Sequence, residues 1–266
     1  MSWLGALTRW RQRRQARSRE RVLQRRAIPD ALWLDTLRDY PFLKRRPLAE
    51  LQLLRELTAL FLDRKEFCAT GGLEMTDAMA VAIAAQACVP ILHLGLEGYD
   101  SFVGIVVHPD EVVKHRKVTD DDGVVHDYDE TSLGEAMYRG PLSLSWRHVV
   151  EGAVTEPWVC NVVIHEFVHV LDMADGEVDG VPPQPSAGAR RHWIQVMEAA
   201  HARLCRAMDR GEPTFLDPYA SEHLSEFFPV ASEAFFVDPQ GLSEAHPEVY
   251  DLLRDYFHQD PARHVR

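Results

Sequence analysis

One short segment, residues 162–172 with the sequence VVIHEFVHVLD, places two histidines four residues apart in an otherwise apolar run. Residues four apart lie on the same face of an α-helix, so His165 and His169 can direct their imidazole rings at one point. Glu166 lies about 100° further round the helix and reaches the side of that point. Two neutral imidazoles with an adjacent carboxylate are the groups that a hydrolytic zinc site requires. The pattern therefore predicts a helix, within residues 159–173, that carries two metal ligands.

The neighbours of this motif distinguish a metal site from a chance occurrence on a surface helix. The flanking residues are apolar, namely Val162, Val163, Ile164, Phe167, Val168, Val170 and Leu171. Such flanks carry the histidines and the glutamate into the interior, where polar groups without partners are costly. A divalent cation shared by these groups would satisfy them. A pair of core histidines satisfied by other protein groups is the less favoured alternative.

A catalytic zinc site also needs a third protein ligand and an open position for water. In a metzincin-like arrangement this ligand would be Asp175, six residues after His169, although Asp172 stands where a turn-forming glycine is expected. In a gluzincin-like arrangement it would be a glutamate from a later helix. The segment 219–236 offers three such residues, Glu222, Glu226 and Glu233. Steps of four and seven residues place these three near one helical face, and spacing alone does not choose among the four carboxylates.

Hydrophobic periodicity divides the chain into helical, strand-like and again helical regions. Helices are predicted over 48–67 and 76–92, short strands within 101–109, 111–118 and 140–150, and further helices over 159–173, 189–210, 222–237 and 244–258. This order favours an α+β fold that is mainly helical with a small, mostly antiparallel sheet. We expect residues 1–28 to form a basic N-terminal tail. Residues 29–266 are expected to form a single domain of N-terminal helices, central sheet and C-terminal metal-binding helices.

Charge is distributed unevenly along the chain. The formal net charge is −12, yet residues 1–26 hold nine arginines and one acid, a net of +8 that leaves −20 for the rest. An acidic body argues against nucleic acid as a direct partner. The basic tail could lie on an anionic membrane surface, but a solvated tail is favoured because its apolar part is short.

The cysteines and the N-terminus predict a cytoplasmic protein. Four cysteines, Cys68, Cys88, Cys160 and Cys205, lie far apart without the paired spacing of a zinc ribbon or the density of a disulfide scaffold. They are expected to be reduced and largely buried thiols. The first residues run directly into arginines and contain no apolar stretch typical of a signal peptide. No segment approaches the roughly 20 apolar residues that span a bilayer.

Several blocks of sequence together resemble one known family. They are FLDRKEF, AAQACVPILHL, GEAMYRGPLSLSW, NVVIHEFVHVLDMADGEVDG, DPYASEHLSEFFPVASEAFF and HPEVYDLLRDYFHQDP. In this order, from about residue 30 onward, they resemble the Mlc titration factor A family. Members of that family are zinc peptidases with a catalytic core similar to that of anthrax lethal factor. The resemblance implies a gluzincin-like zinc peptidase core in this chain.

The resemblance also implies a role for individual residues. In that family the zinc is held by the two motif histidines and by a glutamate seven residues after a tyrosine, which here is Glu226 after Tyr219. One zinc ion per chain would thus be bound by His165, His169 and Glu226. Glu166 would be the general base, and Tyr219 would stabilise the transition state. Bacterial members are linked to binding the glucose repressor Mlc, so an Mlc-type repressor is a candidate partner.

One position departs from the family pattern, which usually has Phe-Ala-Val after the ligand glutamate. This chain has Phe228-Pro229-Val230. Proline lacks an N–H and crowds the carbonyl four residues earlier, that of Ser225. Either the helix begins close to Glu226, so that Pro229 lies in its first turn, or the helix kinks beside the ligand.

These observations predict a zinc-dependent peptidase, aminopeptidase-like on small substrates, that uses a metal-activated water. A peptide or protein substrate could lie along an exposed strand such as 140–148. The alternative is a non-catalytic regulator that binds a repressor or another protein, with a structural or vestigial zinc site. A structural site is normally closed, four-coordinate and often rich in cysteine. Only Cys160 lies near the motif in sequence, which favours the peptidase.

Overall fold

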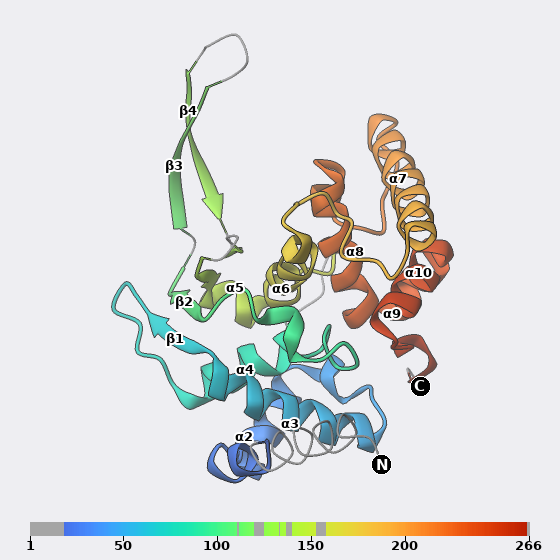
Figure 1. Cartoon of the computed structure of the whole chain (residues 1–266). Helices are drawn as coiled ribbons and strands as arrows, with labels where there is room; N and C mark the ends of the chain where they lie inside the picture. The colour runs from blue at the N-terminus through green and yellow to red at the C-terminus, as the bar shows by residue number, and fades with distance from the viewer. Residues whose placement is uncertain are drawn as a thin grey trace, which may run out of the picture.

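The computed structural model describes residues 19–110, 112–119, 125–132, 134–136, 140–152 and 158–264 (Figure 1). The described chain is mainly helical. Its longer helices are α2 (Asp30–Asp39), α3 (Leu48–Arg64), α4 (Asp77–Ala87), α6 (Val162–Asp172), α7 (Ala187–Asp209), α8 (Leu224–Val237) and α10 (Pro247–Phe257). Shorter helices are α5 (Trp146–Glu151) and α9 (Pro239–Ala245), with short 3₁₀ turns between them. Among the described residues, none of the helices is both long enough and apolar enough to cross a bilayer.

Most of the predicted helices are confirmed, with ends set by local capping. Thr76 accepts a hydrogen bond from the backbone N–H of Met79 and starts α4 at Asp77. The region predicted as one helix over 244–258 divides at His246. Pro247 occupies the first position of α10, where its missing N–H costs nothing.

The N-terminal basic region is described only in part. Residues 1–18 of the predicted tail lie outside the described residues. Residues 19–25 are helical, and Arg19 and Arg25 pair with Glu56 and Asp63 of α3 at 2.7 and 2.6 Å. Ile28 is buried in the core. The described end of this region therefore contacts α3, and the division into a tail and one domain stays a prediction.

The prediction of a mostly antiparallel sheet is wrong. Strands β1 (Glu66–Ala69), β2 (Gly104–His108) and β6 (Leu142–Ser145) pair in parallel, in the order β1-β2-β6. Within the described part of the chain, only the two-residue strand β5 (Gly134–Glu135) joins this sheet antiparallel, beside β6. Alternation of apolar and polar residues sets which face of a strand is buried, but it carries no information on strand direction. Long connections separate β1, β2 and β6 in the chain, and such connections permit parallel pairing.

A separate antiparallel hairpin accounts for the remaining strands. Strands β3 (Val112–Thr119) and β4 (Val125–Ser132) pair with each other and extend away from the rest of the molecule (Figure 1). The hairpin lies in the chain between β2 and β5. This hairpin was not predicted, because β4 lies outside the strands that the sequence indicated.

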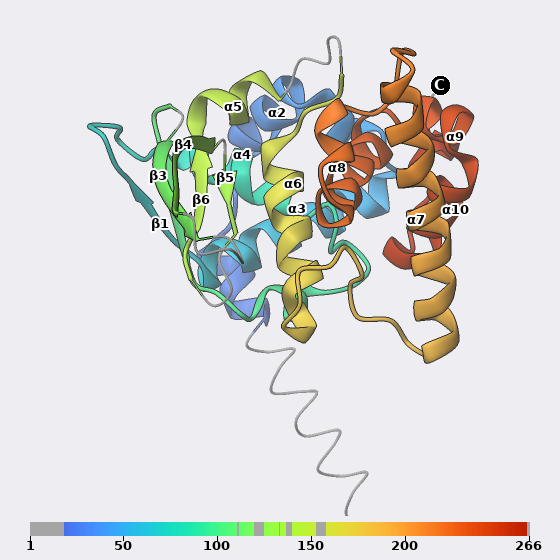
Figure 2. The same ribbon diagram turned by 90° about the horizontal axis from the view of Figure 1, so that it is seen from above.

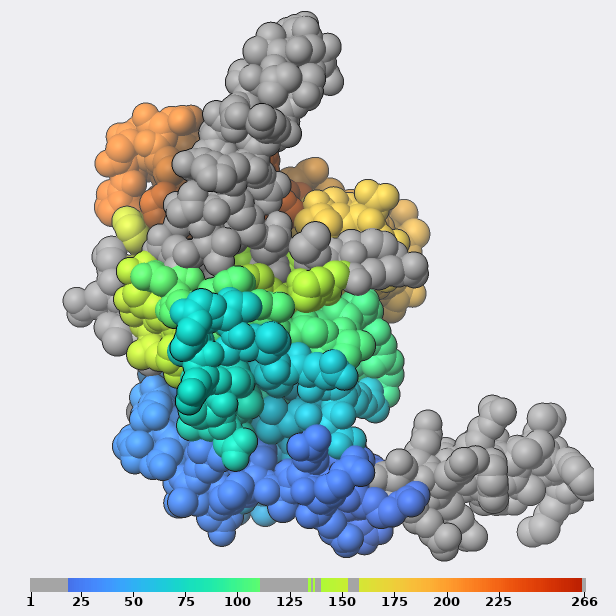
Figure 3. Space-filling model, turned by 90° about the vertical axis from the view of Figure 1, so that its left-hand side faces the viewer, coloured from blue at the N-terminus to red at the C-terminus, as the bar shows by residue number. Residues whose placement is uncertain are grey.

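Helix α6 occupies the centre of the fold. It lies between the sheet on one side and α8 on the other, and it contacts β5, β6, α4 and α8 (Figure 2). Phe167 of α6 is fully buried, and its ring lies 5.0–5.8 Å from the rings of Phe61, Tyr99 and Phe102. In the space-filling view the N-terminal helices, in blue, form the lower part of the molecule, and the later segments, in yellow and orange, lie above (Figure 3). The predicted metal-binding helix is thus anchored by the core of the protein.

Candidate metal centre

Helix α6 directs its two histidines to the same side. Asn161 caps the helix, because its side-chain Oδ1 accepts a hydrogen bond of 3.0 Å from the N–H of Ile164. The apolar residues of α6 are buried, whereas the side chains of His165 and His169 retain 13% and 12% exposure. The two rings lie 4.8 Å apart. The apolar sequence around the motif therefore fixes the helix while both rings remain accessible from one side.

Helix α8 brings the glutamate to these histidines. It begins at Leu224, so Glu226 is its third residue, and it runs as one helix through Pro229 to Val237. Pro229 is therefore the sixth residue of the helix, beyond the first turn that was one of the two alternatives left open by the sequence. Glu226 stands before the proline, in the first turn, where its N–H bonds to the carbonyl of His223. Pro229 has no N–H to donate to the carbonyl of Ser225, so one hydrogen bond of the helix is missing there. The Glu226 side chain still faces α6.

Three ligand atoms converge between α6 and α8. Nε2 of His165 lies 3.1 Å from Nε2 of His169 and 3.1 Å from Oε2 of Glu226, and Nε2 of His169 lies 3.3 Å from the same oxygen. Ligands about 2.0 Å from a common tetrahedral centre lie about 3.3 Å apart, so this triangle has the dimensions of one face of a zinc-type site. Among the described residues, these three form a group that could hold a metal ion.

Charge and burial shape the protonation of this group in the metal-free protein. Burial disfavours the charged forms of both His165 and Glu226, but the hydrogen bonds that these residues make outweigh this effect. The pKa of His165 is raised well above its usual value by hydrogen bonds to Glu226 and Glu233. Hydrogen bonds from His165 and His169 hold the pKa of Glu226 well below its usual range. Glu226 is therefore ionised at neutral pH, as a metal ligand must be.

A buried polar network behind His165 was only partly visible in the sequence. Oε1 of Glu233 accepts a hydrogen bond of 2.7 Å from Nδ1 of His165, and Oε2 accepts one from the backbone N–H of Asn161. The Asn161 amide in turn donates to Oε1 of Gln86 in α4, at 2.8 Å. Gln86, Asn161 and Glu233 are all buried. A carboxylate on the second ring nitrogen orients a ligating histidine and sets its tautomer.

This network predicts that Glu233→Gln weakens metal binding by roughly 10–100-fold, because the amide is a poorer acceptor for the Nδ1–H of His165. The measurement is a competition titration against a chelator of known affinity. Glu222→Gln is the matched control, since the same chemical change is made at an exposed position. Equal affinities of the Glu233 variant and the parent would show that this contact does not orient the ligand.

Two of the candidate third ligands lie elsewhere. Asp175 is exposed in a 3₁₀ turn (Met173–Asp175), where its Oδ1 accepts the N–H of Glu177 at 3.3 Å. Glu222 is exposed at the end of the turn that precedes α8. Neither belongs to the group of converging ligand atoms. The prediction that Glu222, Glu226 and Glu233 share one helical face is wrong for Glu222, because α8 starts only at Leu224.

Glu166, the residue after His165 in α6, lies against strand β5. It is 5% exposed, and a Cβ on Gly134 would come within 2.6 Å of its Cγ and Oε1. Gly134 thus provides space for the Glu166 side chain, a role that the sequence did not reveal.

The structure does not support the idea that a substrate lies along an exposed strand at 140–148. Strand β6 pairs on both sides, with β2 and with β5, and Trp146 already begins α5.

Tyr219 faces the same region from a short 3₁₀ turn, η4 (Pro218–Ser221). Its ring centroid lies 6.0 Å from that of His165, and 43% of the residue is exposed. Asp217 caps the turn, because its Oδ1 accepts the Tyr219 N–H at 2.8 Å. The structure therefore brings all five predicted site residues to one region. His165, Glu166 and His169 come from α6, Glu226 from α8, and Tyr219 from the turn before it.

The loop between α6 and α7 contacts both helices that carry the ligands, at the end of α6 and at the start of α8. The N–H of Gly180 donates to Oδ2 of the buried Asp172 at 2.9 Å, and its carbonyl accepts from Nε1 of Trp193 in α7 at 2.8 Å. Gly180 has a φ of +75°, and a Cβ there would collide with the backbone carbonyl of Leu224, the first residue of α8. Gly180 therefore fixes how closely α8 approaches the end of α6.

We expect Gly180→Ala to destabilise the protein because the new methyl group meets a backbone atom that cannot move independently. Gly72→Ala is the control, since Gly72 also has a positive φ of +81° but would meet nothing within 4 Å. The difference between the two variants in free energy of unfolding should be about 1–3 kcal/mol. Denaturant titration of the metal-free variants measures it, and identical losses would rule out the close approach.

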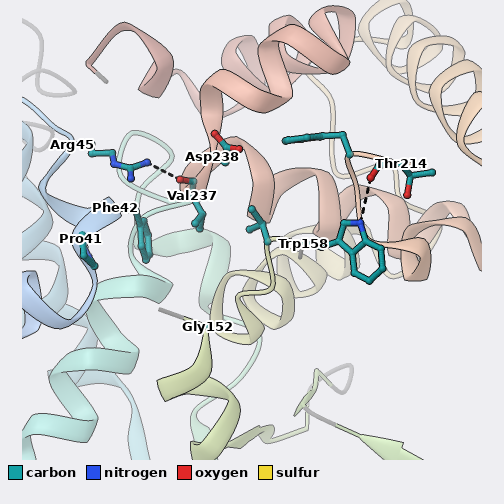
Figure 4. A pocket seen from close by; sticks show the side chains of 10 residues that line it. Pro41, Phe42, Arg45, Gly152, Trp158, Thr214, Val237 and Asp238 are labelled. Carbon is teal, nitrogen blue, oxygen red and sulfur yellow. Dashed lines mark hydrogen bonds between the residues drawn. The ribbon is translucent and has the colours of Figure 1, made fainter. Parts of the chain in front are cut away.

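A separate pocket lies at the opposite end of α8. Its volume is about 440 Å³, and Val237 and Asp238 line it together with Phe42 and Trp158. The guanidinium of Arg45 donates a hydrogen bond of 2.8 Å to the Val237 carbonyl, and Nε1 of Trp158 donates one of 3.3 Å to the Thr214 carbonyl. Both bonds are drawn as dashed lines in Figure 4. The predicted site residues do not line this pocket. It is therefore distinct from the region around Glu226.

The four cysteines differ from expectation in burial. Cys88 is buried and Cys205 is partly buried, but Cys68 and Cys160 are exposed. All four are free thiols. The prediction that the cysteines are largely buried is wrong for Cys68 and Cys160, and their reduced state stays a prediction.

A paired-histidine helix with a converging carboxylate is typical of metallopeptidases, and the comparison with known proteins indicates the same class. The family model described as glucose-regulated metallo-peptidase M90 matches residues 9–258. An uncharacterized protein of Synechocystis is 34% identical over 248 residues, covering 91% of this chain and 89% of its own. Mlc titration factor A of Salmonella arizonae is 31% identical, covering 89% and 94%, and that of Serratia proteamaculans is 32% identical, covering 87% and 88%. The chain belongs to the glucose-regulated metallo-peptidase M90 family, as its resemblance to Mlc titration factor A predicted.

Proposed function

We propose that this protein is a zinc-dependent peptidase whose metal is held by His165, His169 and Glu226. The observation that carries the proposal is the triangle of ligand atoms with 3.1–3.3 Å sides beside the buried carboxylate of Glu166. Two imidazoles and one carboxylate suit zinc better than magnesium or calcium, which prefer oxygen ligands. Three ligands leave one tetrahedral position open, as in catalytic zinc sites. The family assignment supports the same class of protein.

The chain's own residues account for the remaining chemistry. A zinc ion would supply Lewis acidity toward a carbonyl and lower the pKa of a nearby water. Glu166 accepts a proton as the water oxygen attacks the scissile carbonyl carbon. It then passes that proton to the amine as the C–N bond breaks, so protons balance over the two steps. Glu233 keeps His165 oriented, and Tyr219 donates a hydrogen bond to the oxyanion that develops.

Tyr219→Phe should retain the metal and lose roughly 10²–10³-fold in kcat, the loss observed when one oxyanion donor is removed. Phenylalanine keeps the ring 6.0 Å from that of His165 and removes only the hydroxyl group. Steady-state kinetics with metal analysis of the same preparation measures both quantities. A variant with parental turnover, or one that loses its metal, would contradict the role of Tyr219.

The proposed substrate is a peptide or protein, with aminopeptidase-like action on small substrates, and the proposed location is the cytoplasm. A screen of aminoacyl and internally cleaved chromogenic peptides tests the activity, using zinc-loaded, chelated and Glu166→Gln protein. Hydrolysis that depends on both zinc and Glu166 supports the proposal. Protein that takes up zinc but cleaves none of these peptides would favour the second candidate function.

The second candidate is regulation through a protein partner. Relatives carry the name Mlc titration factor A, which favours an Mlc-type repressor as that partner. In this case the metal site would be structural or vestigial, or peptidase activity and partner binding would coexist. Titration of the purified chain with a purified Mlc-type repressor, with and without zinc, distinguishes these possibilities.

A further inference from the structure

Helix α7 contacts the turn that carries Tyr219 through one side chain. Nε2 of His201 lies 3.1 Å from the carbonyl oxygen of Ser221, the last residue of η4. A carbonyl oxygen can only accept, so the imidazole carries its proton on Nε2 and donates it. Tyr219 stands two residues before Ser221 in the same turn. The contact thus joins a 23-residue helix to the segment that holds the proposed oxyanion donor.

The turn is short and needs outside support. Within it, Ala220 N–H bonds to the Asp217 carbonyl at 3.0 Å, and Glu222 N–H bonds to the Tyr219 carbonyl at 3.1 Å. The last carbonyls of a helical turn have no amide partner inside that turn. Asp217 secures the first end by capping Tyr219 N–H, and His201 satisfies the Ser221 carbonyl at the other end.

We propose that His201 is a positioning residue that holds Tyr219 at the metal centre through its hydrogen bond to Ser221. The inference rests on the proposed role of Tyr219 as oxyanion donor. Tyr219 is 43% exposed, and the hydrogen bonds at both ends of η4 fix the backbone segment that carries its ring. Orientation of a donor matters because a small displacement weakens a hydrogen bond that forms in the transition state.

Two other contacts of His201 must be separated from this hydrogen bond. Its ring lies edge-on to Phe227, with centroids 5.8 Å apart, and Phe227 follows the ligand Glu226. Cys205, one turn later on α7, lies 3.8 Å from Nε2 and 3.7 Å from the same Ser221 carbonyl. Packing against Phe227 would act on metal binding, whereas the bond to Ser221 would act on turnover.

Two substitutions divide these effects. His201→Phe keeps an aromatic ring against Phe227 and loses the donor, whereas His201→Gln loses the ring and keeps an N–H at the position of Nε2. His201→Phe should lower kcat by roughly three- to ten-fold, the worth of one hydrogen bond, with KM and zinc affinity unchanged. His201→Gln should stay within about twofold of the parent. Cys205→Ala is the control for the weak sulfur contact and should behave as the parent.

A double-mutant cycle with Tyr219→Phe tests whether His201 acts through the tyrosine. In the Tyr219→Phe background, His201→Phe should cause no further loss of kcat, because the hydroxyl group it positions is gone. The same fold-loss in both backgrounds would overturn the proposal. A parental kcat in His201→Phe would also overturn it. An equal loss of kcat in His201→Phe and His201→Gln would do the same.

Amide hydrogen exchange provides a readout that does not depend on activity. The amides of Ala220 and Glu222 should exchange faster in His201→Phe than in the parent or His201→Gln, in zinc-free and zinc-loaded protein alike. Unchanged exchange in His201→Phe overturns the proposal whatever the kinetics. If Tyr219→Phe itself proves fully active, the proposed role of Tyr219 fails. The exchange result would then still decide whether His201 holds the turn.

Discussion

Glu166→Gln is expected to retain zinc and to lose roughly 10²–10⁴-fold in peptide hydrolysis, the contribution typical of a general base. Glutamine has nearly the same shape, so it fits the space that Gly134 leaves beside this side chain. Its amide cannot accept a proton from water at neutral pH. The kinetic loss should therefore appear without a change in zinc affinity or in the free energy of unfolding.

The experiment compares kcat, zinc content and stability of Glu166→Gln with those of the parent and of Glu222→Gln. The latter makes the same substitution at an exposed acid and should match the parent. A Glu166→Gln protein that hydrolyses at the parental rate would remove Glu166 from the mechanism. A variant that loses zinc would instead point to a structural role for this carboxylate.

Glu226→Ala is expected to abolish tight zinc binding. The parent should bind about one zinc per chain, because one triangle of ligand atoms joins His165, His169 and Glu226. Removal of Glu226 leaves two imidazoles and also removes the negative charge that both rings face. The loss in affinity should exceed the 10–100-fold expected for Glu233→Gln, which changes only an orienting contact.

Asp175→Ala and Glu222→Ala are the controls for this prediction. Both carboxylates are exposed and outside the converging group, so zinc affinity should stay within about twofold of the parent, as expected of surface changes away from the site. Zinc titrations in the presence of a competing chelator would rank the four proteins. A Glu226→Ala protein that binds zinc as tightly as the parent, beside an Asp175→Ala protein that does not, would move the third ligand to the segment after α6.

What the sequence determined by itself was local. The helix bearing His165, Glu166 and His169 follows from a repeat of 3.6 residues and from apolar flanks that bury it, and both act within a few turns of one segment. The start of α4 after Thr76 has an equally local cause. The break at Pro247 is also local in cause, although the sequence pattern predicted one helix over 244–258 there. For the third carboxylate, spacing left four candidates, and only the resemblance to a family singled out Glu226.

Tertiary structure decided what depends on contacts between distant segments. Strand direction was mispredicted because the alternation of residues in β2 and β6 is the same for parallel and antiparallel pairing. Strand β1 was not predicted at all, because its first residues were assigned to the helix predicted over 48–67. Glu226 follows His165 by 61 residues, so its approach to the histidines depends on how α8 packs against α6. The space at Gly134, the link through Gly180 and the bond from His201 to Ser221 arise in the same way. Each of these contacts brings together residues that are far apart in the chain, and local sequence patterns do not indicate such pairs.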